Sequence, residues 1–353
     1  MLRTLLPDAL SLMLSAFRPL RPTAHAARWA MGMVLIVVSV GVFGCGSEPS
    51  VSSDDSRTDA LDRSVGVRPP VERVVSLAPN LTELVVAAGG ASSLAAVTTA
   101  ADHPPTVVDS LPKLSALPVD FEAVAAAEPD LVLATTQVNA PRDAGTFDAL
   151  GLPVYFFSFE TVGDVFDAMR TLGRLLGTDD IARRRANRLA ARLDTLRHYT
   201  EALSRPRVLV LIGDDTLYSF GSGSYVHTLV DAAGGESITA TVDASAPTLT
   251  DEYVLKEEPD VIVGAWGPDY DPERLLDLHP TWDVVPAVKN GRVYSMPPGL
   301  LLRPGPRLVD GAWTLARSLH PRALSDAAGR PSVSHDASPT PSPIPSPTPS
   351  PTQ

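Results

Sequence analysis

The sequence lacks the features that mark several large classes of protein. Its 353 residues include one cysteine, Cys45, so no disulfide can form within the chain. Acidic residues outnumber basic ones and the formal net charge is −12, which argues against nucleic acid as a partner. Neither Gly-x-x-x-x-Gly-Lys nor Gly-x-Ser-x-Gly occurs, so nucleotide binding at a phosphate loop and serine hydrolysis are disfavoured. We expect a protein that is not an enzyme.

The histidines show no metal-binding pattern. A His-x-x-x-His pair is absent, and the seven imidazoles are scattered along the chain. They are His25, His103, His198, His227, His279, His320 and His335. We therefore predict neither a metal centre nor a resident cofactor, and a receptor for free zinc or manganese is the weaker alternative. The backbone N–H groups of the glycine-rich turn FGSGSY at 220–225 could hold an anion. An exported enzyme is therefore a second alternative function.

The beginning of the chain has the pattern of an export signal. Arginines up to Arg28 precede an uncharged apolar run from Trp29 to Phe43. This run is shorter than the roughly 20 residues that a membrane-spanning helix needs. It leads into VFGC, which resembles a bacterial lipobox, so we expect residues 1–44 to be an export signal and Cys45 to carry lipid. The protein would then be anchored on the periplasmic or cell-surface side of a bacterial membrane.

Two segments are too polar or too rich in proline to bury a core. Residues 45–70 are rich in serine and aspartate and are expected to form a flexible tether. Residues 323–353 are dominated by proline, serine and threonine and are expected to be disordered. The folded part is therefore predicted to lie between about residues 71 and 322.

Two phrases occur twice in the predicted folded part. FEAVAAAEPDLVLATT at 121–136 matches DEYVLKEEPDVIVGAW at 251–266, and LTELVVAAGG at 81–90 matches VHTLVDAAGG at 226–235. In the first pair a short helix must end before the proline, and the apolar run after it is typical of a strand in a parallel sheet. The second pair predicts an apolar helix closed by glycine. The repetition predicts two related α/β lobes.

The predicted lobes cover residues 71–159 and 204–322. Between them, residues 160–203 have apolar side chains at helical spacing and are expected to form a rigid helical connector. Two packed surface helices, broken near Gly177, are the alternative interpretation. The expected fold class is α/β, with two related Rossmann-like lobes on parallel sheets, a long connecting helix and a ligand cleft between the lobes.

A series of motifs gives the chain a family resemblance. They are RVVSLAPNLTELVVAAGG, ADHPP, both Glu-Pro-Asp phrases, HPTWDVVPAVKNGRVYSM and RPGPRLVDGAW. The chain resembles the substrate-binding proteins of ABC importers for vitamin B12 and iron-siderophores, and DHPP is most like the vitamin B12 binders. This resemblance implies a monomeric receptor that captures a cobalt or iron chelate, such as a corrinoid, and delivers it to an ABC permease and its ATPase. A ferric siderophore or haem is the alternative ligand.

Candidate ligand contacts lie in loops that follow the predicted strands, where clefts form in parallel sheets. They are Pro79, Asn80, His103, Tyr218, Trp266 and Arg303. The resemblance implies that Tyr218 and Arg303 line the pocket. Trp266 can instead anchor the core, and Arg303 can instead pair with a surface carboxylate. Asn80 also has capping-box spacing to Glu83.

Three aromatic positions of the vitamin B12 binders hold small residues here. The three residues are Ala100, Ala116 and Ala246. This departure favours a bulky metal chelate in general over vitamin B12 itself.

Two glutamates occupy the same place in the doubled phrase. Glu122 and Glu252 each lie near the start of a short predicted helix, where a carboxylate is favoured by the helix dipole. A capping role is therefore the simpler interpretation. The family resemblance implies more, because its members use one exposed glutamate in each lobe to dock on arginines of the two permease subunits.

Overall fold

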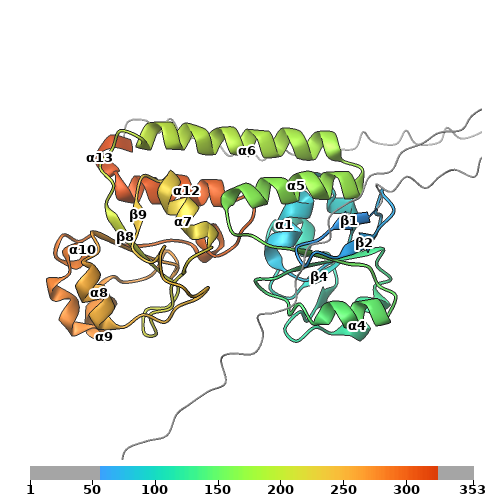
Figure 1. The fold of residues 1–353 in the computed structure, drawn as a ribbon, viewed down its shortest axis with the longest axis horizontal. Coiled ribbons are helices and arrows are strands. Elements are labelled where there is room, and N and C mark those ends of the chain that lie inside the picture. Colours follow the sequence, from blue (N-terminus) through green and yellow to red (C-terminus); the bar gives the residue numbers. More distant parts are fainter. Residues whose placement is uncertain (1–55, 325–353) are drawn as a thin grey trace, which may run out of the picture. The chain divides into compact units, whose positions relative to one another are not determined.

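Each lobe is built on one parallel sheet (Figure 1). The computed structural model describes residues 56–324, so the predicted signal, Cys45 and nearly all of the proline-rich tail lie outside the described residues. The first sheet has the order β5-β4-β3-β6-β7, with every pair parallel. Its strands are β3 (Val74–Ser76), β4 (Leu94–Thr98), β5 (Lys113–Leu114), β6 (Leu131–Thr135) and β7 (Val154–Phe157).

The second sheet repeats this topology with one strand fewer. Its order is β11-β10-β8-β9, again with parallel pairs. Its strands are β8 (Arg207–Leu211), β9 (Glu236–Ser237), β10 (Val261–Gly264) and β11 (Val293–Ser295). In both sheets the chain first moves outward from the opening strand and then crosses to its other side. The predicted α/β class and the two related lobes are therefore confirmed.

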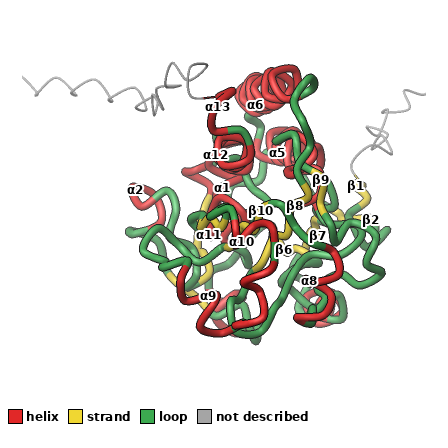
Figure 2. The backbone as a smooth tube through the Cα atoms, turned by 90° about the vertical axis from the view of Figure 1, so that its left-hand side faces the viewer, coloured by secondary structure: helices red, strands yellow, loops and turns green. Residues whose placement is uncertain are grey.

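Helices cover both faces of each sheet. Figure 2 shows α5, α12 and α6 on one side of the strands and α8 and α9 on the other. The first lobe contains α1 (Pro79–Ala88), the 3-10 turn η1 (Ala91–Ser93), α2 (Pro105–Val108), α3 (Phe121–Ala126) and α4 (Asp143–Ala149). The second contains α7 (Tyr225–Ala232), α8 (Asp251–Glu257), α9 (Glu273–Leu278), the 3-10 turn η2 (Pro280–Val284), α10 (Pro286–Lys289), α11 (Pro298–Leu301), α12 (Leu308–Leu319) and α13 (Pro321–Leu324).

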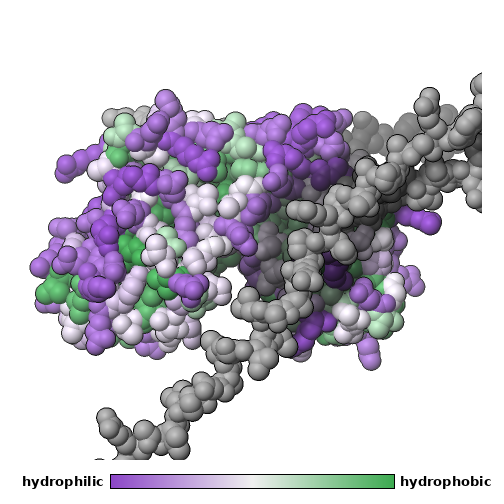
Figure 3. Space-filling model, in the orientation of Figure 1, coloured by the Kyte–Doolittle hydropathy of each residue, from purple (hydrophilic) through white to green (hydrophobic). Residues whose placement is uncertain are grey.

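The connector consists of α5 (Val162–Leu176) and α6 (Asp179–Thr200). The helices part at Gly177, whose φ of 71° is a left-handed conformation that favours glycine, and this is where the alternative interpretation placed the break. Thr161 begins α5 with a capping box. The long helix α6 contacts both lobes and presents hydrophilic residues along its edge of the molecule (Figure 3).

Hydrogen bonds fasten α6 at both ends. Near its start, Nη1 of Arg185 donates to the backbone carbonyl of Ala87 in the first lobe at 3.0 Å. Further along, Nη2 of Arg192 lies 2.7 Å from Oδ1 of Asp310 in α12. At its end, the Thr200 hydroxyl donates to the carbonyl of Ala232 in α7 at 3.1 Å. The expected connecting helix therefore joins the lobes directly.

One apolar core runs through both lobes. It contains buried side chains of α1, α5, α6, α7 and α12, which pack into a single cluster. Representative members are Leu84, Met169, Leu193, Val230 and Leu315. Two smaller cores fill the opposite face of each sheet, one around Phe147 under α3 and α4, the other around Trp282 under α8 and α9.

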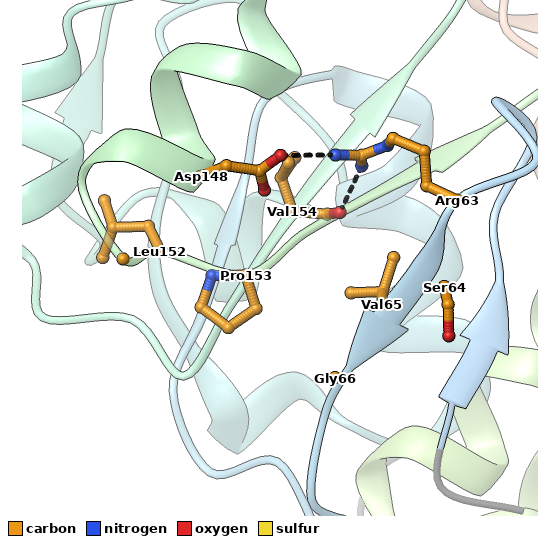
Figure 4. Close-up of a pocket in the computed structure, with 9 residues that line it drawn as sticks. Arg63, Ser64, Val65, Gly66, Asp148, Leu152, Pro153 and Val154 are labelled. Atoms are coloured by element: carbon orange, nitrogen blue, oxygen red, sulfur yellow. Dashed lines mark hydrogen bonds and ion pairs between the residues drawn. The ribbon is translucent and has the colours of Figure 1, made fainter.

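Residues 56–66, part of the expected tether, are folded. Strands β1 (Ser56–Thr58) and β2 (Ser64–Gly66) form an antiparallel hairpin on the first lobe. Its turn docks on edge strand β7, because Ala60 N–H donates to the Phe156 carbonyl at 2.9 Å. Arg63 donates to the Val154 carbonyl at 2.8 Å beside a hollow of about 480 Å³ (Figure 4). Composition suggested a tether, but alternate apolar residues from Val65 onward are buried here.

The Glu-Pro-Asp phrase fastens a helix to the first strand of each lobe. Oδ2 of Asp130 accepts the Arg73 N–H at 2.8 Å, and Oδ2 of Asp260 accepts the Arg207 N–H at 2.9 Å. Each arginine side chain also donates two hydrogen bonds to backbone carbonyls at the end of the helix before the phrase. Arg73 bonds the carbonyls of Ala127 and Glu128, and Arg207 bonds the carbonyl of Glu257 twice. The glutamate before each proline has positive φ, 47° at Glu128 and 44° at Glu258. The repeated phrase is therefore first of all a repeated structural joint.

Candidate ligand-binding site

The candidate site is formed by loops at the carboxyl ends of the parallel strands. In each sheet the strand order reverses beside the opening strand, and open α/β sheets bind ligands at such a switch point. The segments are 77–80, which includes the start of α1, 99–104 and 136–139 in the first lobe, and 212–218, 265–270 and 296–303, which includes α11, in the second. Every predicted ligand contact lies in one of these loops or directly beside it.

The two lobes touch at the candidate site through a polar cluster. The buried Asn80 side chain donates to the Pro304 carbonyl at 3.2 Å. Glu83 accepts two hydrogen bonds from Arg307, at 2.8 and 2.6 Å, although the Glu83 side chain is only 3% exposed. These hydrogen bonds raise the pKa of Arg307 above its ordinary value. Buried carboxylates need such a partner, so Glu83 fixes Arg307 in place.

The expected capping box at Asn80 and Glu83 is wrong. Helix α1 begins at Pro79, its N-cap is Ala78, and no side chain caps it. Proline suits the first helical position because its missing N–H has no partner there. Glu83 is committed to Arg307, a residue of the other lobe that local spacing cannot reveal.

Arg303 pairs with a carboxylate, one of the two roles considered for it. Nη1 and Nη2 of Arg303 donate to the two carboxylate oxygens of Asp102, the second at 3.1 Å. Hydrogen bonding from Arg303 lowers the pKa of the Asp102 carboxyl. Asp102 directly precedes the half-buried His103 in the ADHPP motif. The motif was recognised in the sequence, but its charged partner lies about two hundred residues away and has no local signal.

The aromatic candidates divide into one exposed and one half-buried residue. Tyr218 is 48% exposed, and its loop is held where Ile212 N–H donates to the Tyr218 carbonyl at 2.8 Å. Trp266 stacks at a tilt on Tyr270, with ring centroids 4.1 Å apart. Its ring also covers Gly264, where any side chain would overlap it, and packs against the second lobe's core. Trp266 therefore anchors the core of the second lobe, one of its two predicted roles, and its contact with a ligand stays a prediction.

A family model described as periplasmic binding protein matches residues 74–300. The chain belongs to the periplasmic binding protein family. The family resemblance predicted from the motifs is thereby confirmed.

Named relatives in this family extend over most of the chain. An uncharacterized ABC transporter substrate-binding lipoprotein of Bacillus subtilis is 25% identical over 86% of this chain and 99% of its own length. The vitamin B12-binding protein of Vibrio cholerae serotype O1 is 25% identical over 68% of this chain and 86% of its own length.

Solved structures show the same two-lobed fold. The periplasmic vitamin B12 binding protein of Vibrio cholerae has a TM-score of 0.64 at 25% identity, covering 71% of this chain and 97% of that one. A periplasmic haem-binding protein of Roseiflexus has a TM-score of 0.62 at 24% identity, covering 71% and 99%. The second likeness is one of fold alone.

The periplasmic binding protein fold leaves the two repeated glutamates exposed. Asp120, not Glu122, caps α3, since its Oδ1 accepts the Ala123 N–H at 2.9 Å. Thr250, not Glu252, caps α8 through the Tyr253 N–H at 3.2 Å. Glu122 and Glu252 are therefore not the N-cap residues, but each lies in the first turn of its helix, where the expected favourable interaction with the helix dipole applies.

Histidines in the second lobe serve its internal structure. Nε2 of His227 lies 2.6 Å from the Gly221 carbonyl, and burial lowers the pKa of His227. His279 bridges Asp251 and the Asp214 carbonyl at 2.8 and 2.7 Å. Within residues 56–324 there is no cluster of three or more histidine, cysteine or acidic side chains suited to a metal ion. Among the same residues, no helix has the length and hydrophobicity to span a membrane.

Removing the Glu83 carboxylate tests the contact between the lobes. Glu83→Ala leaves the mostly buried Arg307 guanidinium without its hydrogen-bond acceptor, and we expect a loss of about 2 kcal/mol in the free energy of unfolding. Urea unfolding followed by tryptophan fluorescence measures it. Glu72→Ala, which removes an exposed glutamate, is the control and should match the wild type. Equal midpoints for Glu83→Ala and the control would contradict a stabilising role.

Proposed function

We propose that this chain is the extracytoplasmic substrate-binding lipoprotein of an ABC importer and that it captures a corrinoid-type metal chelate. The observation that carries the proposal is the pairing of two switch-point loop sets, one from each lobe, in a member of the periplasmic binding protein family. Relatives over most of its length are named as a substrate-binding lipoprotein and as vitamin B12-binding proteins. Cys45 is the proposed lipid-bearing residue.

The side chains of the candidate site suit a large flat chelate. Such a ligand needs apolar or aromatic walls and a few polar groups that fix its orientation. The exposed Tyr218 ring and the Trp266–Tyr270 stack supply aromatic surface in the second lobe. Pro79 and His103 of the first lobe supply the opposite side, and Arg303 of the second lobe supplies a charged polar group. The metal would arrive already bound within the chelate and would need no protein ligand.

A ligand panel tests this proposal. We expect a corrinoid such as cyanocobalamin to raise the melting temperature, because ligand at a hundred times its dissociation constant stabilises by about 2.7 kcal/mol. Haem, a ferric siderophore and free zinc or manganese should give smaller shifts at equal concentration. Stabilisation by haem or the ferric siderophore, with none by the corrinoid, would replace the proposed ligand by that chelate.

The two repeated glutamates are proposed to dock the protein on its permease. Both are exposed in the first turn of a short helix, and neither forms an ion pair with a described residue. The Glu-Pro-Asp joint explains the end of the doubled phrase but makes no use of these carboxylates. Two acidic side chains at equivalent places would fit basic side chains of two like permease subunits. Complementary charges of this kind guide encounter and orientation.

The docking role predicts a separation between binding and delivery. Glu122→Ala combined with Glu252→Ala should abolish uptake of the ligand while its affinity and the melting temperature stay near wild type. Uptake is measured in cells that produce the cognate importer. The control replaces two other exposed glutamates, Glu72→Ala with Glu160→Ala, and should support normal uptake. Wild-type uptake by the first double variant would exclude the docking role.

A further inference from the structure

An accessible pair of opposite charges joins two loops of the candidate site. Asp102 belongs to the loop after β4 in the first lobe, and Arg303 to the segment after β11 in the second. Both terminal nitrogens of Arg303 donate to the Asp102 carboxylate, one to each oxygen. The Asp102 side chain is 66% exposed and that of Arg303 is 25% exposed. A ligand that reaches Arg303 therefore meets Asp102 at the same time.

The loop holds Asp102 at this place. Ala101 N–H donates to the Thr98 carbonyl at 2.9 Å at the end of β4. From the neighbouring strand, Nζ of Lys113 donates to the Ala101 carbonyl at 2.6 Å. Both backbone groups of Ala101, the residue before Asp102, are thus hydrogen-bonded. The Asp102 carboxylate points toward Arg303 of the other lobe.

Asp102 is the main counter-ion of Arg303. The second carboxylate nearby belongs to Glu83, whose Oε1 lies 3.8 Å from Nη1 of Arg303. The Glu83 carboxylate accepts its two hydrogen bonds from Arg307 and none from Arg303. The cluster holds two guanidinium groups and two carboxylates, so its formal charges cancel. An arriving ligand finds hydrogen-bonding groups at this place without an uncompensated positive charge.

The pair presents donors beside acceptors. A guanidinium carries five N–H groups, and the carboxylate oxygens of Asp102 can accept more bonds than Arg303 supplies. A primary amide matches this arrangement, since its carbonyl accepts from the arginine while its NH₂ donates to the carboxylate. A ligand carboxylate has no hydrogen to donate and is repelled by the like charge of Asp102.

We infer that Asp102 is a specificity-determining residue, which makes the site accept chelates edged with amides and disfavour chelates edged with carboxylates. The inference rests on the proposed function and narrows its ligand class. Corrinoids that carry amide side chains fit this selection, whereas haem, with its two propionates, does not.

Two corrinoids that share one ring test the inference directly. The probes are dicyanocobinamide, edged with amides, and dicyanocobyrinic acid, edged with carboxylic acids. Dissociation constants from quenching of tryptophan fluorescence give their affinity ratio in the full-length protein. The wild type should prefer the amide form. Asp102→Asn removes the negative charge and keeps a hydrogen-bond acceptor. It should therefore reduce the preference for the amide form over the acid form about tenfold, a change of about 1.4 kcal/mol in relative binding free energy.

Asp109→Asn is the matched control, because Asp109 is an exposed aspartate nearby in α2's C-cap. It should leave the ratio at the wild-type value. The inference would be overturned if Asp102→Asn left the affinity ratio unchanged, even if it weakened the binding of both corrinoids equally. It would also be overturned if the wild type preferred the acid form. If neither corrinoid binds, the corrinoid proposal fails, and haem compared with its dimethyl ester then tests Asp102 by itself. Tighter binding of haem than of its ester to the wild type would overturn the inference there too.

Discussion

The structure depends on one apolar core that the two lobes and the connector share. Leu193 and Leu196 of α6 lie in the same cluster as buried residues of α1 in the first lobe and of α12 in the second. Each fully buried side chain of this size contributes about 1.5–3 kcal/mol. Separating the lobes would expose this surface to water, so the lobes are held together by the same packing that folds each of them. The ion pairs between the lobes at the candidate site, Arg303–Asp102 and Arg307–Glu83, fix which loops face each other.

The internal repeat has one role within each lobe and a second, proposed role in docking. Asp130 and Asp260 use it to fasten a helix to the opening strand of each sheet, a role completed within the lobe. Glu122 and Glu252 form no ion pair with a described residue and lie exposed at equivalent places. A shared core keeps these places at a fixed separation, which is what two binding partners of fixed spacing require.

The sequence predicts the large elements of this fold because their signals are local. Helical spacing from residue 160 to 203, a break at Gly177 and apolar runs after Glu-Pro-Asp all act within a few turns or strands. The hairpin at 56–66 was not predicted, because its polar composition gives no sign that Val65 and Asp59 are buried.

The candidate loops were also predictable, since they follow the buried strands. What the residues do there was less so. Asn80 and Glu83 have the spacing of a local cap, yet both bond to the far lobe. Asp102 was identified only as a member of the ADHPP motif, because its partner Arg303 becomes its neighbour only after both lobes have folded. Contacts of this kind are decided by tertiary packing, and a single sequence carries no periodicity that reveals them.

The spacing of the two exposed glutamates tests most directly whether the shared core holds the lobes together. Spin labels placed by Glu122→Cys and Glu252→Cys, in a Cys45→Ala background, report the distance between α3 and α8 by pulsed electron paramagnetic resonance. Lobes fixed by a common core predict nearly the same distance distribution with and without saturating cyanocobalamin. A ligand-induced shift of the whole distribution by many ångströms, as in hinge closure, would contradict the account.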